Sequence, residues 1–259
     1  MCGRFVLGST PEVLRAAFGY PERPNFPPRF NIAPTQPIAV VREDRGTREF
    51  VLMRWGLIPS WVKDPRTFSL LINARGETLL DKPAFRNAIR RRRCLVPADG
   101  FFEWKAEGKI KQPFFIRRRD RAPFAFAGIW EAWTGPNGEE LETACIVTTR
   151  ANATLAALHD RMPVIVPEAA FPRWLDCAGE DPRDALELVV PASDDLLEAY
   201  EVSAAVNRTA NDSPDLLAPL GPMPATERPA AKAATARRPA QKRESKREEP
   251  SSSGQGSLF

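Results

Sequence analysis

Five short apolar segments between residues 94 and 149 constrain the fold of this chain more than any other feature. They are rich in Phe, Ile and Val, and Gly100, Gly108 and the GPNG sequence at 135–138 separate them as turns. The segments are 94–96, 101–105, 112–116, 124–130 and 143–149. Consecutive strands joined by turns form hairpins, so we expect an α+β fold with a mainly antiparallel, curved or barrel-like β-sheet core and peripheral helices.

The other predicted elements surround this strand-rich middle. A helix is expected between Thr10, a typical N-cap residue, and Gly19, a typical stop, with its apolar face at 13–14 and 17–18. A second helix is expected after the capping sequence DKP at 81–83, and it would end in the four arginines at 90–93. Further strands are expected at 38–41, 49–54, 164–166 and 188–190, and further helices at 152–158 and 168–175.

Composition changes near Gly221, which divides the chain into a predicted folded domain at 1–220 and a tail at 221–259. The tail is dominated by Ala, Pro, Ser and charged residues, so it buries too little apolar surface to offset its ordering entropy, and we expect disorder. It carries eight Lys or Arg and four Glu, which leaves 29 basic and 29 acidic residues in the remainder. Any nucleic-acid surface on the neutral folded domain must therefore be a local basic patch.

Several classes of protein are disfavoured by what the sequence contains. No apolar run approaches the ~18 to 20 residues that span a bilayer, and the start lacks the apolar core of a secretory signal, so no membrane is expected. The four cysteines form no C-x-x-C pair, and the chain has one histidine, which argues against a zinc site. We expect no metal, no cofactor and a cytoplasmic location, with Cys94 and Cys145 as core residues in apolar strands.

Cys2 is the first candidate for chemistry because it directly follows the initiator methionine. Removal of Met1 would leave an α-amine and a thiol on adjacent carbons, an arrangement that condenses with an aldehyde to an imine and then a thiazolidine. The amine has a pKa near ~8, so a fraction of it is neutral and nucleophilic at cytosolic pH. On its position alone, Cys2 is better explained as an incidental small residue near a frayed terminus, so the rest of the chain must decide.

Three other polar residues are candidates, and each has a simpler structural interpretation. Asn73 follows an apolar run and could satisfy a turn. Glu103 lies on the predicted strand 101–105, where a glutamate is usually solvated. His159 is the one histidine of the chain, and a single histidine is more often structural than catalytic.

The order of the motifs around these residues is more specific than any single residue. The chain contains, in sequence, MCGRF at 1–5, NIAP at 31–34, WGLIPSW at 55–61, INARGET at 72–78, ADGFFEW at 98–104 and HDRMP at 159–163. This series, spanning about 2–207, closely resembles the SRAP family, the SOS-response-associated peptidase proteins that process abasic sites in DNA. The resemblance implies a DNA damage protein that crosslinks covalently to abasic sites in single-stranded DNA, with lyase-type Schiff-base chemistry.

The resemblance also implies a role for individual residues. Cys2 would be the nucleophile that captures the open aldehyde of the abasic sugar, and Glu103 would move protons during ring opening and Schiff-base formation. His159 would orient the sugar, and Asn73 would bond near the N-terminal amine. The expected DNA contacts are Arg4, Arg75 and Arg161, with Trp61 stacking on bases and Trp55 packing in the core. The arginine runs at 90–93 and 117–119 are either further contacts or solvated basic faces.

Two other functions remain open from the sequence. Cys2 could be the nucleophile of an N-terminal-nucleophile peptidase that cuts its own first bond, with its own amine, His159 or Glu103 as base. The protein could also be a non-covalent DNA-binding or clamp-adaptor protein. The last residues, including Gln255, Leu258 and Phe259, resemble the peptide by which bacterial repair proteins dock on the replication sliding clamp, although glycine follows the glutamine. The family analogy suggests a monomer.

Overall fold

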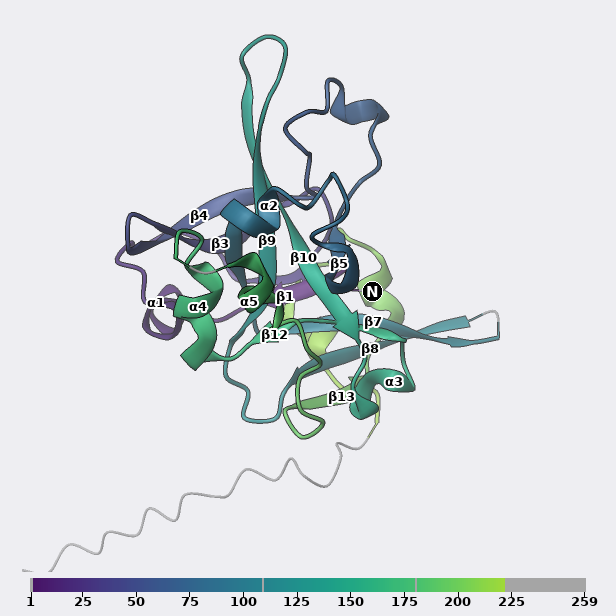
Figure 1. Ribbon diagram of the computed structural model, residues 1–259. Helices are drawn as coiled ribbons and strands as arrows, with labels where there is room; N and C mark the ends of the chain where they lie inside the picture. The colour runs from purple at the N-terminus through teal and green to yellow at the C-terminus, as the bar shows by residue number, and fades with distance from the viewer. Residues whose placement is uncertain (1, 109, 180, 222–259) are drawn as a thin grey trace, which may run out of the picture. The chain divides into compact units, whose positions relative to one another are not determined.

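The fold is built on two β-sheets, and the larger one closes into a barrel (Figure 1). The computed structural model describes residues 2–108, 110–179 and 181–221. Five strands pair in a ring, β10 with β4, β4 with β3, β3 with β6, β6 with β9 and β9 with β10. Their bounds are β3 Pro37–Asp44, β4 Thr47–Trp55, β6 Arg93–Ala98, β9 Phe124–Thr134 and β10 Glu140–Arg150. Only the β10–β4 pair of this ring is parallel.

Three short strands extend the barrel, and a second sheet of five strands packs beside it. The extensions are β5 Asn73–Arg75 and β11 Arg161–Pro163, both on β10, and β12 Ile165–Val166 on β9. The second sheet runs in the order β13 Leu197–Glu201, β8 Ile110–Arg118, β7 Gly100–Glu107, β1 Phe5–Leu7 and β2 Arg29–Ile32, with antiparallel pairs throughout. The predicted α+β fold with a barrel-like, mainly antiparallel core is therefore confirmed.

Aromatic side chains join the two sheets into one core. The ring of Phe5, on β1, lies edge-on to Trp55 with centroids 5.2 Å apart and to Phe126 of the barrel at 5.9 Å. Phe101, the β7 partner of Phe5, also contacts Phe126, at 5.8 Å. All four side chains are fully buried. Because β1 sits at this junction, the start of the chain is fixed between the sheets.

The helices are short and lie outside the sheets, as predicted. They are α1 Pro11–Phe18, α2 Ala88–Arg91, α3 Ala153–Ala156, α4 Phe171–Leu175 and α5 Pro182–Leu186. The Thr10 side chain accepts a hydrogen bond from the amide of Val13, and Gly19 ends α1 in the left-handed conformation at φ 72°. Leu14 and Phe18 are buried as expected, but Val13 is 44% exposed, so the buried face of α1 is narrower than predicted.

Three sequence expectations are corrected by the structure. Residues 188–190 form no strand: the preceding segment is helix α5, and the chain then leaves it through a turn. Gly100 is not a turn residue but the first residue of β7, where a β-carbon would lie 2.3 Å from the Phe115 ring, so only glycine fits. The helix expected after 81–83 is regular only at Ala88–Arg91, and Arg93 already belongs to β6. The region 222–259, most of the predicted tail, lies outside the described residues.

Candidate functional site

The main chain around Cys2 is held by contacts to both sheets. β1 pairs with β7 through Phe5 and Phe101, and the amide of Phe102 donates to the carbonyl of Arg4 at 2.9 Å. From the barrel side, Asn73 Nδ2 donates a hydrogen bond of 2.8 Å to the Cys2 carbonyl. Asn73 is placed by β5, which runs parallel to β10 with Asn73 opposite Ile146. Two motifs 71 residues apart therefore meet.

The Cys2 thiol is fully buried and lies under the influence of a buried carboxylate. Burial raises the pKa of the Cys2 thiol, and the negative charge of Glu103 raises it further. Glu103 lies on β7 and is 6% exposed, so the interpretation of a solvated strand glutamate is wrong. The thiol contacts the carbonyl oxygen of Arg4 at 3.9 Å. At neutral pH the protonated thiol is therefore the dominant form, and activation must come from elsewhere.

Asn73 has a second polar atom in the same place. Its Oδ1 is buried and accepts no hydrogen bond from any residue that the structure describes. Leaving such an acceptor unsatisfied costs roughly 1–3 kcal/mol. The Asn73 amide therefore fixes Cys2 with one end and offers a free acceptor with the other, which suits a bound polar group.

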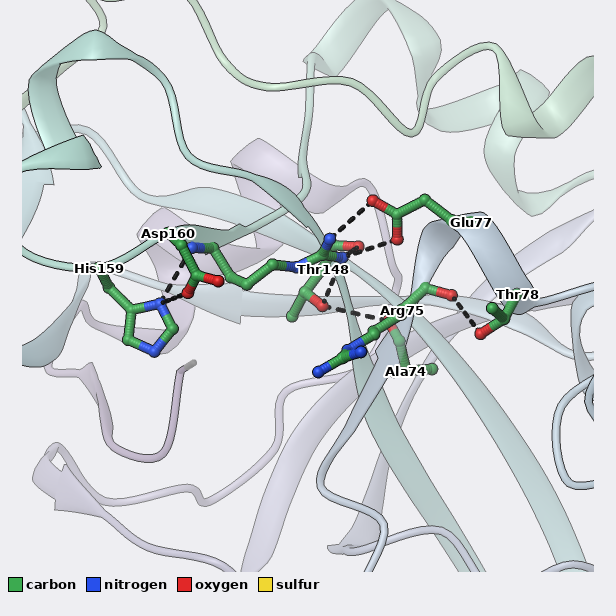
Figure 2. A network of polar contacts seen from close by, with 8 residues as sticks. Ala74, Arg75, Glu77, Thr78, Thr148, His159 and Asp160 are labelled. Atoms are coloured by element: carbon green, nitrogen blue, oxygen red, sulfur yellow. Dashed lines mark hydrogen bonds and ion pairs between the residues drawn. The ribbon is translucent and has the colours of Figure 1, made fainter.

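His159 lies on the neighbouring loop, after α3, and is partly exposed. Its Nδ1 accepts a hydrogen bond of 2.9 Å from the amide of Arg161 and lies 2.6 Å from Asp160 Oδ1 (Figure 2). Nδ1 can accept from the amide only when it carries no proton, and it can donate to Asp160 only when it does. The two contacts therefore need Nδ1 without and with a hydrogen, which the two tautomers of the neutral ring provide. Nε2 points away from both contacts (Figure 2).

Arg161 is held by the fold through the two terminal nitrogens of its guanidinium, whereas its buried Nε has no partner among the described residues. Nη1 and Nη2 donate to the two carboxylate oxygens of Glu77 at 2.6 and 2.9 Å, and Nη2 also donates to the Thr148 carbonyl at 2.7 Å. The hydrogen bonds from Arg161 lower the pKa of Glu77. The Arg161 side chain is only 11% exposed. Its predicted role as a DNA contact stays a prediction, but this arginine already has a structural task.

Arg75, on strand β5, is exposed and differs in this from Arg161. It pairs with Thr148 across the β5–β10 ladder, directly beside the Arg161 network (Figure 2). Its side chain is exposed, and its guanidinium makes no hydrogen bond or ion pair with the described part of the chain. Arg75 is therefore the motif arginine best placed to grip a phosphate.

Arg4 and the NIAP motif form a clamp on the segment that follows β13. Arg4 Nη1 donates to Asn31 Oδ1 and to the Val206 carbonyl, both at 2.8 Å, and burial lowers the pKa of Arg4. The fully buried Asn31 donates through Nδ2 to the carbonyls of Val206, Arg208 and Asn211. The sequence flagged Asn31 only as part of a motif, and its clamping role becomes visible when the segment at 204–211 is in place.

The two tryptophans of the WGLIPSW motif differ in burial as predicted, while the stacking of Trp61 on bases stays a prediction. Trp55 is fully buried, and its indole N–H donates to the Ile72 carbonyl at 3.0 Å. Trp61 is 56% exposed and lies edge-on to Phe68 with centroids 5.6 Å apart. An aromatic ring that is exposed but braced on one side is suited to stacking on a base.

The structure also bears on metals, membranes and the tail. No group of three or more His, Cys, Asp or Glu side chains among the described residues is arranged to hold a metal ion. In that same part of the chain, no helix is long and apolar enough to span a membrane.

Cys94 and Cys145 are fully buried as predicted, and burial raises the pKa of both thiols. The possible clamp-binding residues Gln255, Leu258 and Phe259 lie outside the described residues.

Comparisons with known proteins agree with this architecture. The family described as SOS response associated peptidase (SRAP) matches residues 1–209. The chain is 40% identical over 221 residues to the abasic site processing protein YoqW of Bacillus subtilis (strain 168), covering 84% of this chain and 99% of YoqW. It is 33% identical over 264 residues to the abasic site processing protein HMCES of Gallus gallus, covering 85% and 78% of the two chains. A crystal structure of a Bacteroides thetaiotaomicron protein has a TM-score of 0.75 at 26% identity, covering 83% of this chain and 98% of that one.

Proposed function

Because the chain belongs to the SOS response associated peptidase (SRAP) family, we propose that it processes abasic sites in single-stranded DNA by capturing their aldehyde through Cys2. The relatives YoqW and HMCES are named for abasic site processing. The observation that carries the proposal is the fixed position of Cys2, whose carbonyl is bonded by Asn73 and whose thiol lies within the field of Glu103.

The proposed chemistry begins once Met1 has been removed and Cys2 carries the terminal amine. The amine attacks the aldehyde carbon of the open sugar, a C–N bond forms, and the carbonyl oxygen leaves as water to give an imine. The thiol then adds to the imine carbon: a C–S bond forms, and the thiol proton ends on the nitrogen. The product is a five-membered thiazolidine, and water is the one molecule released.

The raised pKa of the thiol supports this order of steps. A protonated thiol is a weak nucleophile, so the amine reacts first and the thiol closes the ring on the more reactive imine. Glu103 is the group that moves protons between amine, sugar and water, work that contributes ~10² to 10⁴-fold in enzymes. His159 and the free Oδ1 of Asn73 would bind the sugar hydroxyls.

The proposed DNA path runs over the exposed side of the site. Arg75 would bind a phosphate, and Trp61 would stack on a base next to the lesion. Arg161 and Arg4 would act through the network that supports this surface, because their guanidinium groups are bonded within the protein. Closure to thiazolidine would protect the lesion from strand cleavage by β-elimination.

The test uses the purified full-length protein, after intact mass has established that Met1 is absent. It is incubated with single-stranded DNA that carries either an abasic site or a tetrahydrofuran analogue, which has no aldehyde. We expect a heat-stable shifted band on a denaturing gel with the abasic site alone. Binding of both DNAs without a shifted band would overturn the proposal in favour of a non-covalent DNA-binding protein.

Two substitutions separate the steps. Cys2→Ala should abolish the heat-stable band, because the thiazolidine cannot close. Cys2→Ser keeps the amine and a weaker nucleophile, so we expect a stable band only when borohydride reduces the imine. A band that survives in Cys2→Ala without borohydride would place the bond on another residue.

A further inference from the structure

A hollow lined by arginines lies on the barrel away from Cys2. It has a volume of about 560 Å³ and is formed where α2 and α5 lie side by side (Figure 1). Its charged and reactive lining residues are Arg90, Arg91, Arg183, Asp81, Asp181 and Cys177. We call it the arginine hollow. None of these residues belongs to the motifs that define the candidate site.

Two helices carry the three arginines: Arg90 and Arg91 lie on α2, and Arg183 lies on α5. The amides of Arg91 and Arg92 bond to carbonyls four residues earlier, and Ala88 and Ile89 are buried on the inner side of α2. Lys82 and Arg86, in the turns before α2, are also exposed but do not line the hollow.

The arginine run at 90–93 splits into two pairs with different uses. Arg93 is 1% exposed and donates to the carbonyls of Ile89, Trp174 and Asp176, and Arg92 pairs with Glu131 at 3.0 Å. In contrast, the exposed Arg90 and Arg91 make no side-chain hydrogen bond or ion pair with the described residues, and neither does Arg183. Arg92 and Arg93 therefore have structural partners, whereas the guanidinium groups of Arg90 and Arg91 are open to solvent.

The charge around the hollow favours an anion. The lining residues carry three positive charges, on Arg90, Arg91 and Arg183, against the two negative charges of Asp81 and Asp181. Asp181 Oδ1 accepts a hydrogen bond from the Arg183 main-chain amide at 2.7 Å, and neither aspartate pairs with an arginine side chain among the described residues. Guanidinium groups bind phosphate oxygens in bidentate fashion, and an open cluster of three is typical of a site for a phosphate chain.

A second surface hollow, which we call the groove, borders both helix α5 and the motif that contains Arg75. It has a volume of about 520 Å³ and is lined by Gly76 and Glu77, by Arg150 at the end of β10 and by Leu186 of α5. Glu77 is the partner of Arg161 and follows Arg75 by two residues. α5 therefore borders the groove at its Leu186 end and the arginine hollow at its Arg183 end.

We propose that the arginine hollow binds the phosphate backbone of the DNA strand that continues from the lesion, several nucleotides away from the abasic sugar. This inference rests on the proposed function, because it takes the strand to begin at Arg75. The strand would cross the groove beside Arg150 and reach Arg90, Arg91 and Arg183. The hollow would add affinity without reading sequence, since phosphate contacts position a strand but do not identify its bases.

The test compares a triple variant, Arg90→Gln, Arg91→Gln and Arg183→Gln, with a matched control of equal charge change, Arg23→Gln, Arg45→Gln and Arg121→Gln. The control arginines are exposed on loops and turns outside both hollows. Fluorescence anisotropy measures binding of undamaged single-stranded oligonucleotides of 5 and 20 nucleotides over a range of salt concentrations. Crosslinking to an abasic site is measured separately at saturating DNA.

We expect the hollow variant to bind the 20-mer about tenfold more weakly, with a log–log salt slope smaller by about 2, since each contact on a single strand contributes ~0.7. Binding of the 5-mer and the saturated crosslinking rate should stay unchanged. Equal 20-mer affinity and slope in the hollow and control variants would overturn the inference. If the wild-type protein forms no crosslink but the hollow variant still loses 20-mer affinity, the proposed chemistry fails and the arginine hollow stands.

Discussion

The two walls of the candidate site use their polar groups in different ways. The inner wall, Cys2, Asn73 and Glu103, is built at the junction of the sheets, with Cys2 and Glu103 buried and Cys2 bonded by Asn73. The outer wall, Arg75, His159 and Arg161, is built on β5, β11 and the loop before β11, and it opens to solvent at Arg75 and His159. The inner wall holds the groups that we propose react. The outer wall combines the network of Arg161, Glu77 and Thr148 with the exposed guanidinium of Arg75.

This difference separates chemistry from binding. A buried carboxylate acts strongly on its neighbours because little water screens it, whereas an exposed guanidinium contributes through contact with a ligand. Substitutions in the inner wall should therefore change the crosslinking rate at saturating DNA. Substitutions in the outer wall should change either the free energy of unfolding or the affinity for DNA, depending on which arginine is removed.

The largest effect is expected for Glu103→Gln. Loss of the proton-transfer group should slow crosslinking at saturating DNA by about 10²-fold or more, while the affinity for undamaged single-stranded DNA stays unchanged. Single-turnover gel assays with an abasic oligonucleotide measure the rate, and anisotropy measures the affinity. Glu131→Gln is the matched control, because Glu131 is also buried, at 3% exposure, but contacts Arg92 on the barrel and not Cys2.

The sign of this effect tests the role of Glu103 directly. Its negative charge contributes to raising the pKa of the Cys2 thiol, so its removal should make the thiolate easier to form. If thiolate availability limited the reaction, Glu103→Gln would accelerate crosslinking. An accelerated or unchanged rate would therefore exclude Glu103 as the proton carrier.

A second, intermediate effect separates the two outer-wall arginines. Arg161→Ala removes the hydrogen bonds to Glu77 and Thr148 from a side chain that is 11% exposed, so the free energy of unfolding should fall by about 2 kcal/mol. Arg75→Ala should change it by no more than ~0.5 kcal/mol, because its exposed side chain has no such bonds within the described structure. Urea denaturation of both variants measures this difference.

Binding should give the opposite order. Arg75→Ala is expected to reduce the salt slope of single-stranded DNA binding by ~0.7, the share of one phosphate contact. Arg161→Ala should leave the slope unchanged under conditions where the variant is folded. Arg161→Ala could instead unfold at the same urea midpoint as the wild type and show a smaller salt slope. Arg161 would then contact the DNA, and the assignment of the two arginines would be wrong.

The long strands of both sheets could be predicted from the sequence because they are rich in apolar residues and are bounded by turns. Of the five segments of the middle, three lie in the barrel strands β6, β9 and β10, and two lie in β7 and β8 of the second sheet. The short strands β1, β2, β5, β11 and β13 were missed as strands, since three to five residues give no usable alternation. Two of them, β5 and β11, carry Asn73, Arg75 and Arg161, so the sequence indicated which motifs matter but not how they meet.

The individual side chains were harder to predict for a related reason. Glu103 on a strand has the same local sequence signature whether it is solvated or buried, and its burial depends on distant segments such as the one that brings Cys2 close to it. Likewise, Arg75 and Arg161 both occur in motifs, but only the tertiary partners Glu77 and Thr148 separate a structural arginine from an open one. The order of the motifs therefore identifies the site, but the role of each side chain depends on the residues that it contacts in the folded structure.

The smallest effect concerns the acid side of the Arg161 network. Arg161 lowers the pKa of Glu77, so the ion pair stabilises the fold above the unfolded pKa of ~4.3 and loses this contribution as the pH falls through the folded pKa. Glu77 is 52% exposed, so the contribution should stay below ~1 kcal/mol. Glu77→Gln should therefore have a lower free energy of unfolding than the wild type at pH 6, and this difference between the two proteins, the gap, should narrow at pH 3.5. Urea midpoints at both pH values measure it, with exposed Glu140→Gln as control. A gap of equal size at both pH values would mean that Arg161 does not depend on the charge of Glu77.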